Sequence, residues 1–163
     1  MSVLAAKGFV GAGVSSGLKA SGGLDLALIV NRGPEIAAAA VFTTNRCLAN
    51  PIIWSKQVIA DGTARAIILN SGGANCYTGP QGFQTTHATA EKVAELLGDS
   101  ASDVLVCSTG LIGEQLDRDK LCPHALLQCC LSRIKSRLST FQTCLVPSIN
   151  RHRVATPFTR AHR

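Results

Sequence analysis

The sequence has no apolar run long enough to cross a membrane. A spanning helix needs about 20 consecutive apolar residues, and every hydrophobic stretch in this chain of 163 residues is much shorter. The N-terminus also has no extended apolar segment of the kind that marks a secretory signal peptide. Both absences predict a cytoplasmic protein that does not act at a membrane.

The seven cysteines lack the spacing of a structural metal site. Zinc sites usually contain cysteine pairs separated by a few residues, whereas the cysteines of the C-terminal part occur singly or as the adjacent pair Cys129 and Cys130. An odd number of cysteines, with no sign of secretion, also argues against a disulfide framework. We therefore expect no metal, and nothing in the sequence calls for a cofactor.

Acidic residues and glycine are both missing from residues 122–163. This segment contains seven of the 16 Lys and Arg residues and no Asp or Glu, whereas residues 1–121 are nearly neutral. All 15 glycines lie in residues 1–121. The composition predicts two parts with a boundary near Leu121: a globular domain over 1–121 and a basic, Cys-rich tail over 122–163.

Residues 1–121 carry the hydrophobic pattern of a layered α/β domain. Short apolar runs bounded by turn residues predict buried strands at 24–30, 65–70 and 103–107. Residues 37–43 (AAAAVFT) are compatible with a helix or a buried strand, and their β-branched and aromatic end favours the strand. Over residues 81–97 apolar side chains recur at helical spacing, and Gly98 provides a C-terminal stop.

Two of the predicted strands run into glycine-rich strings. Asn70, Ser71, Gly72 and Gly73 lie at the end of the strand at 65–70, and residues 108–113 (STGLIG) follow the strand at 103–107. Glycine tolerates unusual dihedral angles and lets backbone amides approach a ligand closely. We therefore predict Gly-rich loops at the strand ends. The pattern alone names no reaction, because turns of this composition are also common for purely structural reasons.

A series of short strings, taken in order, carries a resemblance to one enzyme family. The strings lie at 8–9, 13–14, 17–19, 25–28 (DLAL), 41–45 (VFTTN), 69–75 (LNSGGAN), 78–79, 108–113 (STGLIG) and 119–121 (DKL). Together they resemble the bifunctional ornithine acetyltransferases of arginine biosynthesis, also called glutamate N-acetyltransferases. The resemblance covers residues 3–121 and depends on the ordered set rather than on any single string.

This resemblance implies transfer of an acetyl group from N-acetylornithine to glutamate, and in some members from acetyl-CoA. Members are made as a precursor that cleaves itself at an Ala-Thr bond. The new N-terminal threonine of the β chain is the nucleophile, activated by its own α-amino group. Members of the family are heterotetramers of two α and two β chains. The sequence here is similar to the α chain, whose oxyanion-hole pair matches Thr109 and Gly110.

The chemistry of acyl transfer needs what these residues offer. The carbonyl oxygen gains negative charge in the tetrahedral intermediate, so hydrogen-bond donors must already point at it. A threonine hydroxyl and a glycine N–H can supply them. The loop at Asn70, Ser71, Gly72 and Gly73 either lines the active site or forms a structural turn. His87 is interpreted as a packed, hydrogen-bonded core histidine and not as a base, because it lies on the apolar face of its helix.

The resemblance ends after Leu121. The family continues with a Thr-Thr-Asp-Thr string, a Lys-Gly-Ser/Ala-Gly-Met string and a Met-Ala-Thr-Met-Leu string that contains the cleavage site, and none of them occurs here. The resemblance thus implies an acetyltransferase truncated before its nucleophile, inactive alone and incomplete in fold without the β chain. Surface intended for the β chain predicts low solubility or self-association.

Residues 122–163 have the composition of a disordered or frameshift-derived tail. The one regular element expected there is an amphipathic helix over 122–138, with Leu126, Cys130 and Ile134 on one side. The alternative function is a non-catalytic binding protein that uses the basic tail for nucleic acid or a protein partner. Nucleic acid is the less favoured partner, because a single aromatic residue accompanies the basic cluster and no binding motif is present.

Overall fold

A four-stranded mixed sheet forms the centre of the computed structural model, which describes residues 3–121, 128, 130–132 and 134. The strand order is β1-β2-β3-β4. β1, β2 and β3 are antiparallel neighbours, and β3 and β4 run parallel. The strands are β1 (Phe9–Val14), β2 (Leu26–Asn31), β3 (Ala66–Gly73) and β4 (Val104–Leu111). The predicted mixed α/β class is confirmed.

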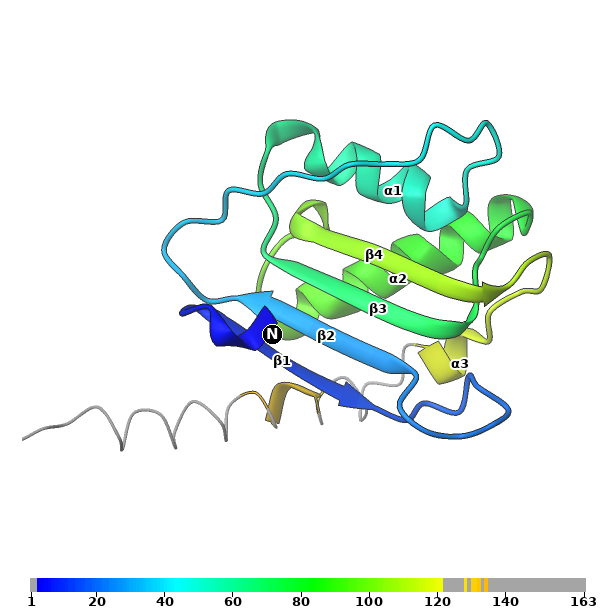
Figure 1. Cartoon of the computed structure of the whole chain (residues 1–163), viewed down its shortest axis with the longest axis horizontal. Helices are drawn as coiled ribbons and strands as arrows, with labels where there is room; N and C mark the ends of the chain where they lie inside the picture. Colours follow the sequence, from blue (N-terminus) through cyan, green and yellow to red (C-terminus); the bar gives the residue numbers. More distant parts are fainter. Residues whose placement is uncertain (1–2, 122–127, 129, 133, 135–163) are drawn as a thin grey trace, which may run out of the picture.

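Helix α2 (Gly79–Leu97) is the crossover that a parallel strand pair requires. It links β3 to β4 and lies across one face of the sheet (Figure 1). The helix stops at Gly98, which adopts a left-handed conformation with φ 70°, as the sequence predicts. Within residues 3–121, the remaining helical segments are α1 (Asn50–Val58), α3 (Arg118–Leu121) and three 3₁₀ turns at Val3–Ala5, Ile59–Asp61 and Ala101–Asp103.

The core lies between α2 and the sheet. Along β2, alternate residues are buried, because successive side chains of a strand point to opposite faces. They pack with buried residues of β3, β4 and α2 in one cluster. Its fully buried members include Leu26, Leu28, Val30, Ile68, Ala90, Val93 and Val104.

Helix α1 covers the outer edge of β4, where backbone groups would otherwise lack partners (Figure 1). The indole Nε1 of Trp54 donates to the carbonyl of Val104 at 2.9 Å. The hydroxyl of Ser55 accepts from the backbone N–H of Val106 at 3.1 Å and donates to its carbonyl at 2.9 Å. Two neighbouring side chains thus take the place of a fifth strand.

The strand predicted at residues 37–43 is wrong. Ala37 makes one isolated bridge with Thr63, the rest of the segment has no regular structure, and Val41 is 100% exposed. A run of four alanines offers little apolar area to bury, so the Val-Phe-Thr end does not fix a strand by itself.

Part of the region beyond the predicted boundary packs on the domain. Cys130, Leu131 and Ile134 are helical and buried, and they belong to the same core cluster as β2. The Sγ of Cys130 lies 3.9 Å from the carbonyl oxygen of Ala12 in β1. Most of residues 122–163 lies outside the described residues, including the basic side chains on which the binding alternative depends. The division at Leu121 stays a prediction.

Within the part of the chain that the structure describes, no helix combines the length and the apolar character needed to span a membrane.

Candidate active site

The two glycine-rich strings lie side by side at one end of the sheet. In the parallel pair, Ser71 is in register with Thr109 and Gly72 with Gly110. Both strings belong to the strands, since β3 continues to Gly73 and β4 to Leu111. The expectation of loops at Asn70, Ser71, Gly72 and Gly73 and at Thr109 and Gly110 is therefore wrong. Continued backbone pairing between the strings keeps them extended.

Gly72 and Gly110 are close enough to exclude side chains. A Cβ on Gly110 would lie 2.6 Å from the carbonyl carbon of Gly72, and one on Gly72 would lie 2.8 Å from the carbonyl oxygen of Leu18. Their φ angles of 121° and 131° fall in the region that favours glycine. The backbone of three segments therefore meets at this end of the sheet.

Asp25 holds the third of these segments. Its buried carboxylate accepts hydrogen bonds from the backbone N–H and the hydroxyl of Ser16, at 2.6 and 2.9 Å. It also accepts from the backbone N–H groups of Leu18 and Lys19, at 2.7 and 3.0 Å. Burial alone would raise the pKa of Asp25, but these hydrogen bonds outweigh it and lower the pKa below its ordinary value. The ionised carboxylate thus fixes the 16–19 turn against Gly72.

Asn70 and Ser108 link the two strands through their side chains. The hydroxyl of Ser108 donates to the buried Oδ1 of Asn70 at 2.5 Å, and the Nδ2 of Asn70 donates to the carbonyl of Gly73 at 3.3 Å. Thr109, by contrast, is exposed, and within the described residues no hydrogen bond occupies its hydroxyl. Thr109 therefore keeps a free donor next to the exposed Gly110.

A buried polar cluster supports the turn that follows β3. The Nδ2 of Asn75 donates to the carbonyl of Gly82 at 2.9 Å and to the hydroxyl of Thr86 at 2.8 Å. Its Oδ1 accepts from the hydroxyl of Thr78 at 2.5 Å. The same Thr78 hydroxyl accepts from the Nδ2 of Asn50 at 2.8 Å. This cluster joins the beginnings of α1 and α2.

The polar cluster was not predicted from the sequence, although a signal was present. Thr85, Thr86 and Thr89 recur at helical spacing and are buried on the inner face of α2. Asn75 adopts a φ of 50°, which asparagine tolerates better than most residues. A polar stripe on a core-facing helix beside such a turn indicates a hydrogen-bonded network.

His87 is not a core residue, so that expectation is wrong. Its side chain is 46% exposed, and its Nδ1 lies 3.7 Å from the carboxylate of Glu91. Its ring packs edge-on against that of Trp54, with 4.9 Å between the ring centroids. The buried face of α2 is rotated towards Thr86 and Ala90. His87 thus covers the rim of the core. This position does not test whether His87 acts as a base.

No metal centre is formed by the described residues, where no three His, Cys, Asp or Glu side chains gather in a way that could hold an ion. Cys107 is exposed on β4 as a residue, yet partial burial of its thiol raises the pKa above the ordinary value. A raised pKa keeps the thiol protonated and makes Cys107 a poor nucleophile.

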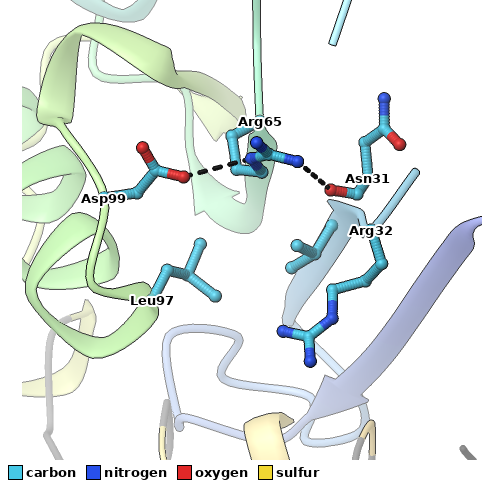
Figure 2. Close-up of a pocket in the computed structure, with 6 residues that line it drawn as sticks. Asn31, Arg32, Arg65, Leu97 and Asp99 are labelled. Carbon is cyan, nitrogen blue, oxygen red and sulfur yellow. Dashed lines mark hydrogen bonds and ion pairs between the residues drawn. The ribbon is translucent and has the colours of Figure 1, made fainter. Parts of the chain in front are cut away.

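A small pocket lies at the other end of the sheet. It has a volume of about 250 Å³ and is bounded by the end of β2, the residue before β3 and the end of α2 (Figure 2). Its lining residues are Val30, Asn31, Arg32, Arg65, Leu97 and Asp99. This pocket was not predictable from the sequence, because its residues come from three separate segments and match no motif.

Fold and site together define a mixed α/β domain in which the parallel strands β3 and β4 present an exposed threonine and glycine at their carboxyl end. The chain belongs to the ArgJ family, whose model matches residues 10–144. This match extends beyond Leu121, where the sequence analysis placed the end of the resemblance.

Relatives named arginine biosynthesis bifunctional protein ArgJ are similar to most of the chain. The protein from Streptomyces coelicolor is 61% identical over 123 residues, which are 76% of this chain and 32% of the relative. The protein from Mycobacterium tuberculosis is 58% identical over 124 residues, 73% of this chain and 31% of the relative. The chain therefore spans about a third of the length of these curated relatives.

Solved structures agree with this assignment. The chain is similar to the ornithine acetyltransferase of Mycobacterium tuberculosis, solved in complex with ornithine, with a TM-score of 0.77 and 52% identity over 80% of this chain and 69% of that one. It is also similar to the bifunctional protein ArgJ of Bacillus halodurans, with a TM-score of 0.71 and 36% identity over 76% of this chain and 64% of that one.

Proposed function

We propose that this chain supplies the oxyanion-stabilising part of a glutamate N-acetyltransferase that takes its acetyl group from N-acetylornithine. Membership of the ArgJ family and the likeness to an ornithine acetyltransferase support the reaction class. The ornithine in that enzyme's structure supports an ornithine derivative as the substrate. Acetyl-CoA as a second donor and a heterotetramer with β chains are further parts of the proposal.

The observation that carries the proposal is the position of Thr109 and Gly110. They lie at the exposed carboxyl end of β4, in register with Ser71 and Gly72 of β3. The Thr109 hydroxyl is an uncommitted donor within the described residues, and Gly110 leaves its backbone open to approach. As the acetyl carbonyl becomes tetrahedral, these donors stabilise the developing negative charge, an effect worth roughly 3–4 kcal/mol per donor in well-studied hydrolases.

Catalysis also requires a nucleophile, for which the proposal relies on the rest of a family-length protein. The Met-Ala-Thr-Met-Leu string that carries the family's threonine does not occur in the 163 residues. Exposed apolar side chains surround the end of β4 and the turn before α2: Tyr77 is 67% exposed, Leu111 58% and Ile112 64%. Apolar groups gathered beside a site support an interface there, and we assign it to the part that bears the nucleophile.

The test is complementation in trans. The chain is co-expressed with the remaining two-thirds of the Streptomyces coelicolor relative, and acetyl transfer from N-acetylornithine to glutamate is measured in the purified complex. The proposal expects transfer by the complex and none by either part alone. T109A should lower kcat by about 10²–10³, whereas S102A, in the 3₁₀ turn that precedes β4, should leave kcat unchanged.

Two outcomes would overturn different parts of the proposal. A complex that forms but transfers no acetyl group would remove the assigned reaction. A transferring complex in which T109A retains full kcat would leave the reaction standing and remove the oxyanion role of Thr109.

A further inference from the structure

The pocket at the far end of the sheet contains more positive than negative side chains. It contains two guanidinium groups, Arg32 and Arg65, and one carboxylate, Asp99 (Figure 2). The proposed acetyltransferase site uses none of them, because it lies at the carboxyl ends of β3 and β4, whereas Arg65 precedes the first residue of β3.

Arg65 and Asp99 neutralise each other. The Nε of Arg65 lies 3.1 Å from the Oδ2 of Asp99, and its Nη1 donates to the carbonyls of Asn31 and Gly33 at 3.2 and 3.3 Å. The other oxygen of Asp99, Oδ1, accepts from the backbone N–H of Ser100 at 3.0 Å. Both oxygens of the carboxylate are therefore occupied by the protein itself, and Arg65 is held rigidly at the wall of the pocket.

Arg32 is the remaining charge. Its side chain is exposed, and within the described residues no hydrogen bond or ion pair engages its guanidinium, while its backbone N–H is fixed by the carbonyl of Gly8 at 2.7 Å. The pocket thus has one uncompensated positive charge on an anchored backbone. Leu97, which is half-buried at the end of α2, adds an apolar side chain to the pocket (Figure 2).

We propose that this pocket binds a small organic carboxylate. The guanidinium of Arg32 forms charge-assisted hydrogen bonds with the carboxylate, a geometry for which arginine is suited. The half-buried side chain of Leu97 contacts the short aliphatic part of the ligand. The volume of about 250 Å³ lies just below the usual range of roughly 300–1,000 Å³ for small-molecule sites, which limits the ligand to a short chain.

The test is equilibrium dialysis of the whole chain against labelled butyrate, a measurement that self-association of the protein does not prevent. We expect one saturable site, weaker binding of acetate because it lacks the aliphatic part, and no competition by butylammonium. R32Q should weaken butyrate binding at least tenfold. R46Q removes an exposed arginine outside the pocket and should change the affinity less than twofold.

The proposal is overturned if butyrate shows no saturable binding or if R32Q binds as tightly as the unaltered chain. Equal losses in R32Q and R46Q would also overturn it, because they would indicate attraction by net charge alone. None of these outcomes bears on acetyl transfer, so the proposed function is tested separately.

Discussion

Gly110 of β4 lies against Gly72 of β3 so closely that a Cβ on Gly110 would come within 2.6 Å of the Gly72 carbonyl carbon. The two glycines are in register across the parallel pair, and both have positive φ angles. The end of the sheet that carries Thr109 therefore depends on backbone packing that any side chain would disturb.

Replacing Gly110 with alanine should lower the free energy of unfolding by about 2–4 kcal/mol, because strain at positive φ adds to steric overlap. G62A is the matched control: Gly62 also has a positive φ, but an added Cβ would meet nothing within 4 Å, so only the strain of about 1–2 kcal/mol remains. Urea unfolding followed by Trp54 fluorescence measures both. Equal losses would contradict the close contact.

Asn75 should be a large contributor to stability. N75A removes four side-chain hydrogen bonds of a buried cluster and should cost about 2–4 kcal/mol. N75G retains the positive φ but loses the same bonds, so it should be nearly as unstable. N45A, at an exposed asparagine, should cost less than about 1 kcal/mol. A stable N75G would show that backbone conformation, rather than the cluster, is what Asn75 provides.

Asp25 should make stability depend on acid pH. Because the pKa of Asp25 is lowered in the folded state, its contribution is fully present above the unfolded pKa of about 3.9 and is lost as the pH falls through the folded pKa. The stability difference between the unaltered chain and D25N should therefore be largest above pH 4 and shrink below it. Chemical denaturation at pH 7, 4 and 3 measures this difference.

D61N is the comparison for the pH series. Hydrogen bonds from Thr63 lower the pKa of Asp61 as well, so the contribution of Asp61 to stability is also lost as the pH falls. Asp61 is exposed and makes its contacts within one turn, which predicts a smaller effect. A difference for D25N that is independent of pH would mean that the carboxylate charge does not hold the 16–19 turn.

Ser55 should stabilise the edge of the sheet. S55A leaves the buried N–H of Val106 without its acceptor, which costs about 1–3 kcal/mol. S102A removes an exposed hydroxyl near the start of β4 and should have a small effect. Hydrogen exchange at the Val106 amide gives an independent measurement, because the amide should exchange faster in S55A than in S102A. Unchanged exchange in S55A would contradict the edge contact.

Elements whose pattern is local were predictable from the sequence. The strand at 26–31 and the helix ending at Gly98 follow from apolar spacing and a terminal glycine. The short helix α1 was not predicted, because its role depends on contact with the edge of β4 fifty residues later. Residues 37–43 were assigned to a strand although no neighbouring strand is available to pair with them.

The candidate site could be predicted only in part. The ordered strings identified Thr109 and Gly110 together with residues 70–73, and the resemblance supplied their roles. Sequence spacing does not reveal that the two strings lie in register, since strand pairing across a crossover is a property of the tertiary structure. The pocket at the other end of the sheet was missed for the same reason, because Arg32, Arg65 and Asp99 meet only after folding.

The crossover by α2 also has a consequence for the order in which the molecule is built. Asn70 and Ser108 are 38 residues apart in the chain but hydrogen-bonded in the fold. Parallel pairing of this kind has a high contact order and forms slowly, after its connecting loop has closed. During synthesis, β3 leaves the ribosome well before β4, so the end of the sheet that carries Thr109 and Gly110 cannot form on a nascent chain shorter than the whole crossover. Its appearance marks the completion of the four-stranded sheet.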